Sequence, residues 1–143
     1  MIAFDTNLLV YVHRSESPFH AKANQVFADV VRSGAAIGVP WPCCHEFIST
    51  VTHPRLWKEP LTGVEAIACI EHLGSVPRLQ FLGEGRDHLA RLRQLGEAAH
   101  LQGGQIHDAR IAAICLSHGV KELLSCDRDF SRFPSLRVRN PLI

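Results

Sequence analysis

Four carboxylates in this chain are placed where they could jointly hold a divalent cation: Asp5, Glu46, Asp108 and Asp127. Asp5 directly follows the apolar run 1–4, and Asp127 directly follows the run 123–126, so each acid ends a predicted strand. Two carboxylates about 5 Å apart repel each other by roughly 3 kcal/mol at an effective dielectric constant near 20. A divalent cation removes this repulsion and can activate water against a phosphodiester. The four acids therefore predict metal-dependent phosphodiester chemistry.

The other two acids interrupt apolar stretches that are typical of helices. Asp108 falls in the first turn of a helix predicted over 105–118, where the helix dipole favours an anion. Glu46 falls within a helix predicted over 43–53, on a face made polar by Ser49 and other hydroxyl and imidazole side chains. We expect this polar face to line a cleft.

Apolar runs of strand length alternate with segments of helical periodicity along the chain. The strands are predicted at residues 1–4, 35–39, 79–82, 123–126 and 136–138, and the helices around 8–11 and over 18–34, 43–53, 62–72, 87–100 and 105–118. This order favours an α/β/α sandwich around a short parallel sheet, formed by a single domain over residues 1–143. Ligands bind at the carboxyl ends of strands in such sheets, and Asp5 and Asp127 are predicted to lie at that edge.

Composition limits the range of functions. The chain has 143 residues, of which 46% are hydrophobic and 20% charged, as in an ordinary folded domain. Its formal net charge of +1 argues against unspecific coating of nucleic acid or of an anionic membrane, so an RNA contact needs a local basic patch. The five cysteines lack CxxC spacing and favour reduced thiols in the cytoplasm. The first apolar run, broken by Asp5, is not expected to be a signal peptide, and no run is long enough to span a membrane.

Four segments carry a resemblance to a known family. They read IAFDTNLLVY from residue 2, CHEF from residue 44, HDARIAA from residue 107 and SCDRDF from residue 125. In this order and spacing they resemble PIN-domain ribonucleases, and among these most closely the VapC toxins of bacterial toxin–antitoxin pairs. The resemblance implies a PIN-like fold and a Mg²⁺-dependent endoribonuclease, with Mn²⁺ as the alternative cofactor.

The resemblance also implies roles for individual residues. Metal ligation is expected chiefly from Asp5 and Asp108, with Glu46 and Asp127 acting directly or through water. Asp129 is a second acid close to Asp127, and either could be the fourth member of the set. The hydroxyls of Thr6 and Ser125 fall where the family places supporting polar groups. A water activated by the metal is then expected to attack in line and leave 5′-phosphate and 3′-hydroxyl ends.

Partners follow from the same resemblance: an RNA substrate, a small cognate antitoxin and a second copy of the chain, with no membrane. The apolar helix around Ile67, Ile70 and Leu73 is expected to supply the dimer face. The candidate contacts to RNA are the basic residues Arg14, Arg55, Lys58, Arg110 and Arg128.

The sequence also bears on three alternative functions. A PIN fold kept as a non-catalytic RNA- or protein-binding module is the alternative, but it is expected to have lost acids, and all four are present. A zinc site is disfavoured because the helix with His45-Glu46 lacks the second histidine of an HExxH motif. A receiver domain needs a paired acid beside the first strand and a lysine on a late strand, and neither is evident: the strand predicted over 123–126 offers Ser125 and Cys126 instead.

Overall fold

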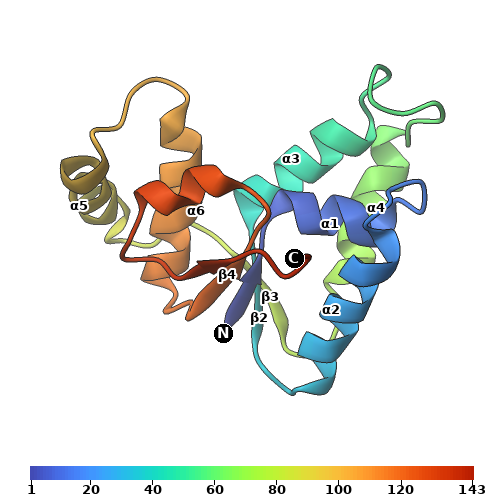
Figure 1. Ribbon diagram of the computed structural model, residues 1–143, viewed down its shortest axis with the longest axis horizontal. Helices are drawn as coiled ribbons and strands as arrows, with labels where there is room; N and C mark the ends of the chain where they lie inside the picture. Colours follow the sequence, from blue (N-terminus) through green and yellow to red (C-terminus); the bar gives the residue numbers. More distant parts are fainter.

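Five short parallel strands run through the centre of the molecule, and helices cover both faces of the sheet (Figure 1). The computed structural model describes residues 1–143. The strands are β1 (Ile2–Phe4), β2 (Ile37–Pro40), β3 (Leu79–Leu82), β4 (Glu122–Leu124) and β5 (Val138–Arg139), in the spatial order β3-β2-β1-β4-β5. The helices are α1 (Thr6–His13), α2 (His20–Arg32), α3 (Trp41–Val51), α4 (Gly63–Leu73), α5 (His88–Ala99) and α6 (Gln105–Ser117), with the 3₁₀ helix η1 (Arg128–Arg132) before β5. The predicted sandwich is confirmed.

The path of the chain reverses direction at the centre of the sheet. From β1 the chain steps outward to β2 and then β3, and it crosses over through α1–α2 and α3–α4. It then returns past β1 to β4 through α5 and α6. Because parallel crossovers are right-handed, steps in opposite directions place their helices on opposite faces, as Figure 1 shows for α2 and α5. The carboxyl ends of β1 and β4 therefore form a topological switch point, where ligands bind in such folds.

The inner strands β2, β1 and β4 are largely buried on both faces, which explains their mainly apolar sequences. Phe4 in β1 is fully buried and packs edge-on against Phe27 of α2, with ring centroids 5.2 Å apart. Gly38 in β2 has no room for a side chain, because an added Cβ would lie 2.6 Å from a methyl group of Leu82. This close packing fixes β2 between β1 and β3, and so fixes where α3 begins.

Local sequence signals explain most helix ends. Pro42 occupies the first turn of α3, where its missing N–H costs nothing. Thr62 and Glu65 form the predicted capping box of α4. The strand predicted over 123–126 is too long at its end, because the N–H of Cys126 turns away to donate to Asn7 Oδ1 (3.2 Å) and β4 ends at Leu124.

The predicted dimer face is wrong for two of its three residues. Ile70 and Leu73 are buried in the core of this chain, with exposed fractions of 7% and 3%. On α4 only Val64 and Ile67 are exposed large apolar side chains. Separately, none of the helices is long and apolar enough to cross a membrane.

Candidate active site

A cleft of about 400 Å³ opens at the switch point, where the carboxyl ends of β1 and β4 meet the first turns of α1 and α6. All four acids predicted from the sequence line it, together with Thr6. The register of β1 and β4 brings Asp5 and the segment of Asp127 to the same edge, because Phe4 is paired with Leu124 and the N–H of Asp5 donates to the Leu124 carbonyl (3.0 Å). The other residues in its wall are Asn7, Val10, Tyr11, Thr50, Leu56, Trp57 and Ile111.

Asp5 lies at the bottom of this cleft and is 4% exposed. Its Oδ1 accepts hydrogen bonds from the backbone N–H of Thr6 (2.8 Å) and from the thiol of Cys43 (3.5 Å). Its Oδ2 accepts from the hydroxyl of Ser125 (2.6 Å) and from the amide of Asn7 (3.0 Å). Burial raises the pKa of Asp5, while the hydrogen bonds from Ser125, Thr6 and Cys43 act in the opposite direction. Four donors thus fix the orientation of a carboxylate that water scarcely reaches.

Glu46 reaches the cleft from the second turn of α3. Its Oε2 accepts a hydrogen bond from the hydroxyl of Thr6 at 2.7 Å, which links α3 to the first residue of α1. The remaining oxygen, Oε1, has no hydrogen-bond partner within the chain. The hydroxyl of Thr6 thus orients Glu46, while its backbone N–H donates to Asp5. A supporting role of Thr6 in catalysis stays a prediction.

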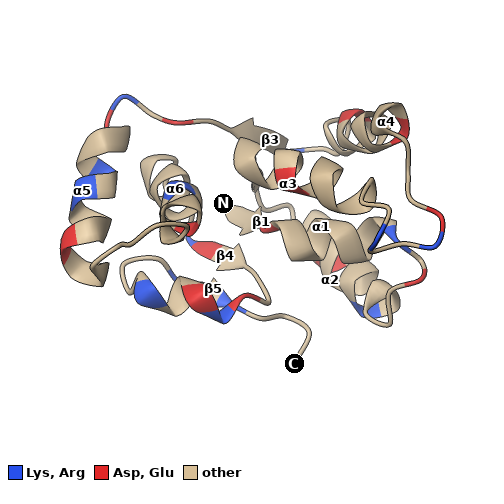
Figure 2. Ribbon diagram, turned by 90° about the horizontal axis from the view of Figure 1, so that it is seen from above, with Lys and Arg blue, Asp and Glu red and all other residues tan.

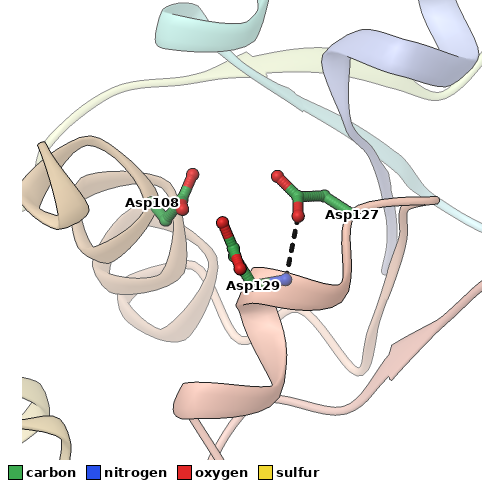
Figure 3. A group of neighbouring side chains, drawn as sticks. All are labelled: Asp108, Asp127 and Asp129. Carbon is green, nitrogen blue, oxygen red and sulfur yellow. Dashed lines mark hydrogen bonds between the residues drawn. The ribbon is translucent and has the colours of Figure 1, made fainter.

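Asp108, Asp127 and Asp129 form the compact part of the acidic site (Figure 3). One ligand oxygen from each can be chosen so that all three lie within 4.8 Å of one another. Asp108 comes from the first turn of α6, whereas the other two come from the segment after β4. Asp127 Oδ1 accepts the N–H of Asp129 (2.8 Å), and this cap starts η1 and turns the second carboxylate toward Asp108. The sequence left open which of Asp127 and Asp129 is the fourth acid, and the structure brings both to the cluster.

The electrostatics of this cluster favour a cation. Burial, followed by the charges of Asp127, Asp5, Asp129 and Glu46, raises the pKa of Asp108 to about 6. No lysine, arginine or histidine forms a salt bridge with Asp5, Glu46, Asp108 or Asp127; Arg132 lies 3.5 Å from Asp129. Repulsion between like charges is thus left unrelieved by the chain itself.

The donor set fits a hard divalent cation such as Mg²⁺ or Mn²⁺, since every candidate ligand atom is a carboxylate oxygen. No histidine or cysteine takes part in a comparable group, which argues further against zinc.

Lysines and arginines are spread along the ribbon (Figure 2), and those named from the sequence differ in their surroundings. Arg14 is buried at 5% exposure, where it donates to Glu16 and to the Glu59 carbonyl (2.8 Å). Its guanidinium also lies 4.5 Å from the ring centre of Trp57, so it fastens the loop that follows α3. Arg110 is paired with Glu84 on the surface.

Three basic residues are free to meet a substrate. Arg55, Lys58 and Arg128 form no salt bridge and no side-chain hydrogen bond. The first two flank Leu56 and Trp57, which line the cleft, and the third follows Asp127 directly. These positions suit contacts to a polyanion passing over the acids.

Sequence reasoning missed several residues that shape the cleft. Asn7 connects both strand ends, because its amide group donates to Asp5 and its oxygen accepts from Cys126 N. Its place two residues after the strand-ending acid was the available signal. Trp57 lies in the cleft wall and donates its Nε1 hydrogen to the Thr50 carbonyl (2.9 Å). No motif or periodicity in the sequence predicts this contact.

Comparison with known proteins agrees with this geometry. The family model described as the PIN domain matches residues 2–136. The chain is 30% identical to ribonuclease VapC48 of Mycobacterium tuberculosis over 138 residues, which cover 96% of this chain and 95% of that protein. It is 33% identical to ribonuclease VapC43 of the same species over 142 residues, covering 99% and 96%.

Solved structures show the same fold at lower sequence identity. VapBC2 from Rickettsia felis, bound to a DNA fragment from its promoter, superposes with a TM-score of 0.70 at 17% identity, covering 97% of this chain and 98% of that one. VapC20 from Mycobacterium tuberculosis, a toxin that cleaves the sarcin–ricin loop, superposes with a TM-score of 0.65 at 16% identity, covering 92% and 93%. By its family match, its full-length relatives and its acidic switch point, this chain belongs to the PIN-domain family, as a relative of the VapC ribonucleases.

Proposed function

We propose that this chain is a metal-dependent endoribonuclease that acts in the cytoplasm as the toxin of a type II toxin–antitoxin pair. The observation that carries the proposal is the cluster of Asp108, Asp127 and Asp129, which continues to Asp5 and Glu46 and has almost no basic partner within the chain. The relatives named as ribonucleases support RNA as the substrate. The toxin–antitoxin complexes among the structural neighbours support an antitoxin partner.

The acids would have different roles in catalysis, according to their positions in the cleft. Asp108, Asp127, Asp129 and Asp5 would hold Mg²⁺ or Mn²⁺, which when bound neutralises phosphate charge and acidifies a coordinated water. Glu46 is held by Thr6 through Oε2, which leaves Oε1 to accept a hydrogen bond from the attacking water. The donors around Asp5 would keep its carboxylate in one orientation through the reaction.

The substrate would enter across the loop that follows α3. Arg55 and Lys58 would contact phosphates on one side of the acids, while Trp57 offers an aromatic face in the cleft wall. The antitoxin would compete for the same cleft, and Val64 and Ile67 on α4 remain available to a second copy of the chain.

The test is cleavage of single-stranded RNA by the purified chain with Mg²⁺ and with EDTA. We expect metal-dependent cleavage that Asp108→Asn lowers by at least about 100-fold, since this removes an oxygen ligand from the cluster. Glu97→Gln is the matched control, because Glu97 is an exposed acid on α5 without a salt bridge.

Metal binding is measured separately by thermal unfolding. We expect Mg²⁺ or Mn²⁺ to raise the Tm of the wild type and of Glu97→Gln, but to raise that of Asp108→Asn much less. Binding of metal without cleavage of any RNA would instead favour the non-catalytic binding module.

A further inference from the structure

A second cavity, of about 500 Å³, lies directly beside the acidic cleft. It is bounded by η1, by β5 and by the segment that follows β5. Asp127 lines both the cavity and the cleft, so one residue forms the ridge between them. An RNA strand with a phosphate at the acids would therefore pass the mouth of this cavity with the next nucleotide.

Half of the twelve residues that line the cavity are hydrophobic. Phe130, Phe133, Leu136 and Val138 are among them, and the two phenylalanine rings pack edge to face with centroids 6.4 Å apart. Apolar walls with a few convergent polar groups are typical of small-molecule subsites. They would accept a flat nucleobase, but they would strip water from a phosphate, which Asp127 would also repel.

Two polar side chains that line this cavity, Arg128 and Asn140, have hydrogen-bond donors that no group of the chain accepts, and Asp127 lies beside them as an acceptor. Asn140 uses its Oδ1 to accept the N–H of Leu142 (2.9 Å) and the thiol of Cys126 (3.5 Å), so its NH₂ group is the end left for a ligand. Arg128 has no partner within the chain. The tail that carries Asn140 is fixed in place, because Lys22 donates to the Leu142 carbonyl at 2.8 Å.

We propose that this cavity is a nucleobase subsite that selects guanine next to the scissile phosphate, with Arg128 and Asn140 reading its O6 and N7 acceptors. Guanine presents two adjacent acceptors, and arginine contacts to this edge are the commonest specific contacts to bases. Adenine places an amino donor at the same edge and would oppose the donors of the cavity. Recognition of an unstacked base in a pocket is the usual route to sequence-specific RNA binding. This inference rests on the proposed ribonuclease function.

The test variant is Asn140→Asp, which keeps an oxygen for Leu142 N and Cys126 Sγ but removes the two donors. Wild type and variant would each cut a randomised single-stranded RNA pool, and the new ends would be sequenced. We expect the wild type to enrich guanine at one fixed position beside the cut, and the variant to lower that enrichment about tenfold or more. Arg128→Gln should act in the same direction. Arg93→Gln, an exposed arginine on α5 without a salt bridge, should leave the preference unchanged.

Two outcomes of the cleavage assay would overturn the subsite while the ribonuclease function stands. One is metal-dependent cleavage by the wild type with no base preference beside the cut. The other is an equal loss of rate on all sequences in both variants, which would show that the side chains contact phosphate.

A binding measurement covers the case in which no RNA is cut and the proposed function fails. Guanosine and cytidine would be titrated separately into the ¹⁵N-labelled protein. We expect guanosine to shift the side-chain NH₂ signals of Asn140 more than cytidine does at the same concentration. Equal shifts, or none, would overturn the subsite independently of catalysis.

Discussion

The two ends of the acidic cleft differ in how the chain surrounds their carboxylates. At the β1 end, Asp5 is buried and receives four hydrogen-bond donors from the chain. At the α6 end, Asp108 faces Asp127 and Asp129 with unrelieved repulsion. The first carboxylate is oriented by the fold, whereas the second depends on a ligand from outside. The difference indicates that the folded chain prepares the geometry of the site and leaves its charge to be balanced by a cation.

The largest expected effect tests this contrast through stability. Asp5→Ala should destabilise the metal-free protein by about 2–4 kcal/mol, because it removes the cap of α1, leaves the Ser125 hydroxyl without its acceptor and takes away one of the two acceptors of the Asn7 amide. Asp108→Ala should leave the free energy of unfolding unchanged or raise it, since it removes repulsion. Chemical denaturation in EDTA measures both. Equal losses of stability in the two variants would break the comparison.

A second prediction uses pH. The pKa of Asp108 is about 6 in the folded protein and has an ordinary value of 3.8, so the folded state binds its proton more tightly than the unfolded state between these values. The metal-free protein should therefore lose stability as pH rises through this window. Asp108→Asn removes that loss, so its Tm advantage over the wild type should be smallest near about pH 4 and largest above about pH 7. A Tm advantage that is constant across this range would contradict the assignment.

The smallest effect concerns Cys43, the weakest of the four donors to Asp5. Cys43→Ala removes the thiol hydrogen bond to Oδ1 and should raise the Mg²⁺ concentration needed for half-maximal cleavage by about threefold. Cys43→Ser keeps a donor and should restore most of the difference. Cys44→Ala, at a neighbouring buried thiol that does not contact Asp5, controls for loss of packing. A change of similar size in the control would assign the effect to the core instead.

The sequence allowed one end of the cleft to be predicted better than the other. Asp5 and Asp127 could be placed together because parallel strands end at the same edge of a sheet. The role of Asp129 could not be ranked, since it depends on η1, a turn that the carboxylate of Asp127 itself begins. The element types were predictable from apolar periodicity, while the end of β4 was not, because the side chain of Asn7, 119 residues away, accepts the N–H of Cys126.

The basic residues show the same limit. Arg14 was a candidate contact to RNA, yet the loop after α3 folds back over it and buries its guanidinium under Trp57. A loop of this kind has no hydrophobic periodicity, so its path cannot be predicted from the sequence. Burial of a single charged residue is therefore hard to predict when the covering segment is irregular.

The position of Trp57 has a practical consequence. The chain contains two tryptophans, and only Trp57 lines the acidic cleft, whereas Trp41 stacks on Phe81 of β3. Its indole is held by the Thr50 carbonyl on one side and the Arg14 cation beneath, so its surroundings are fixed until something enters the cleft. With Trp41 replaced by phenylalanine, the emission of one indole would report occupancy of the cleft in real time. Trp57 is thus an intrinsic fluorescent probe in the cleft where metal, RNA and antitoxin would compete.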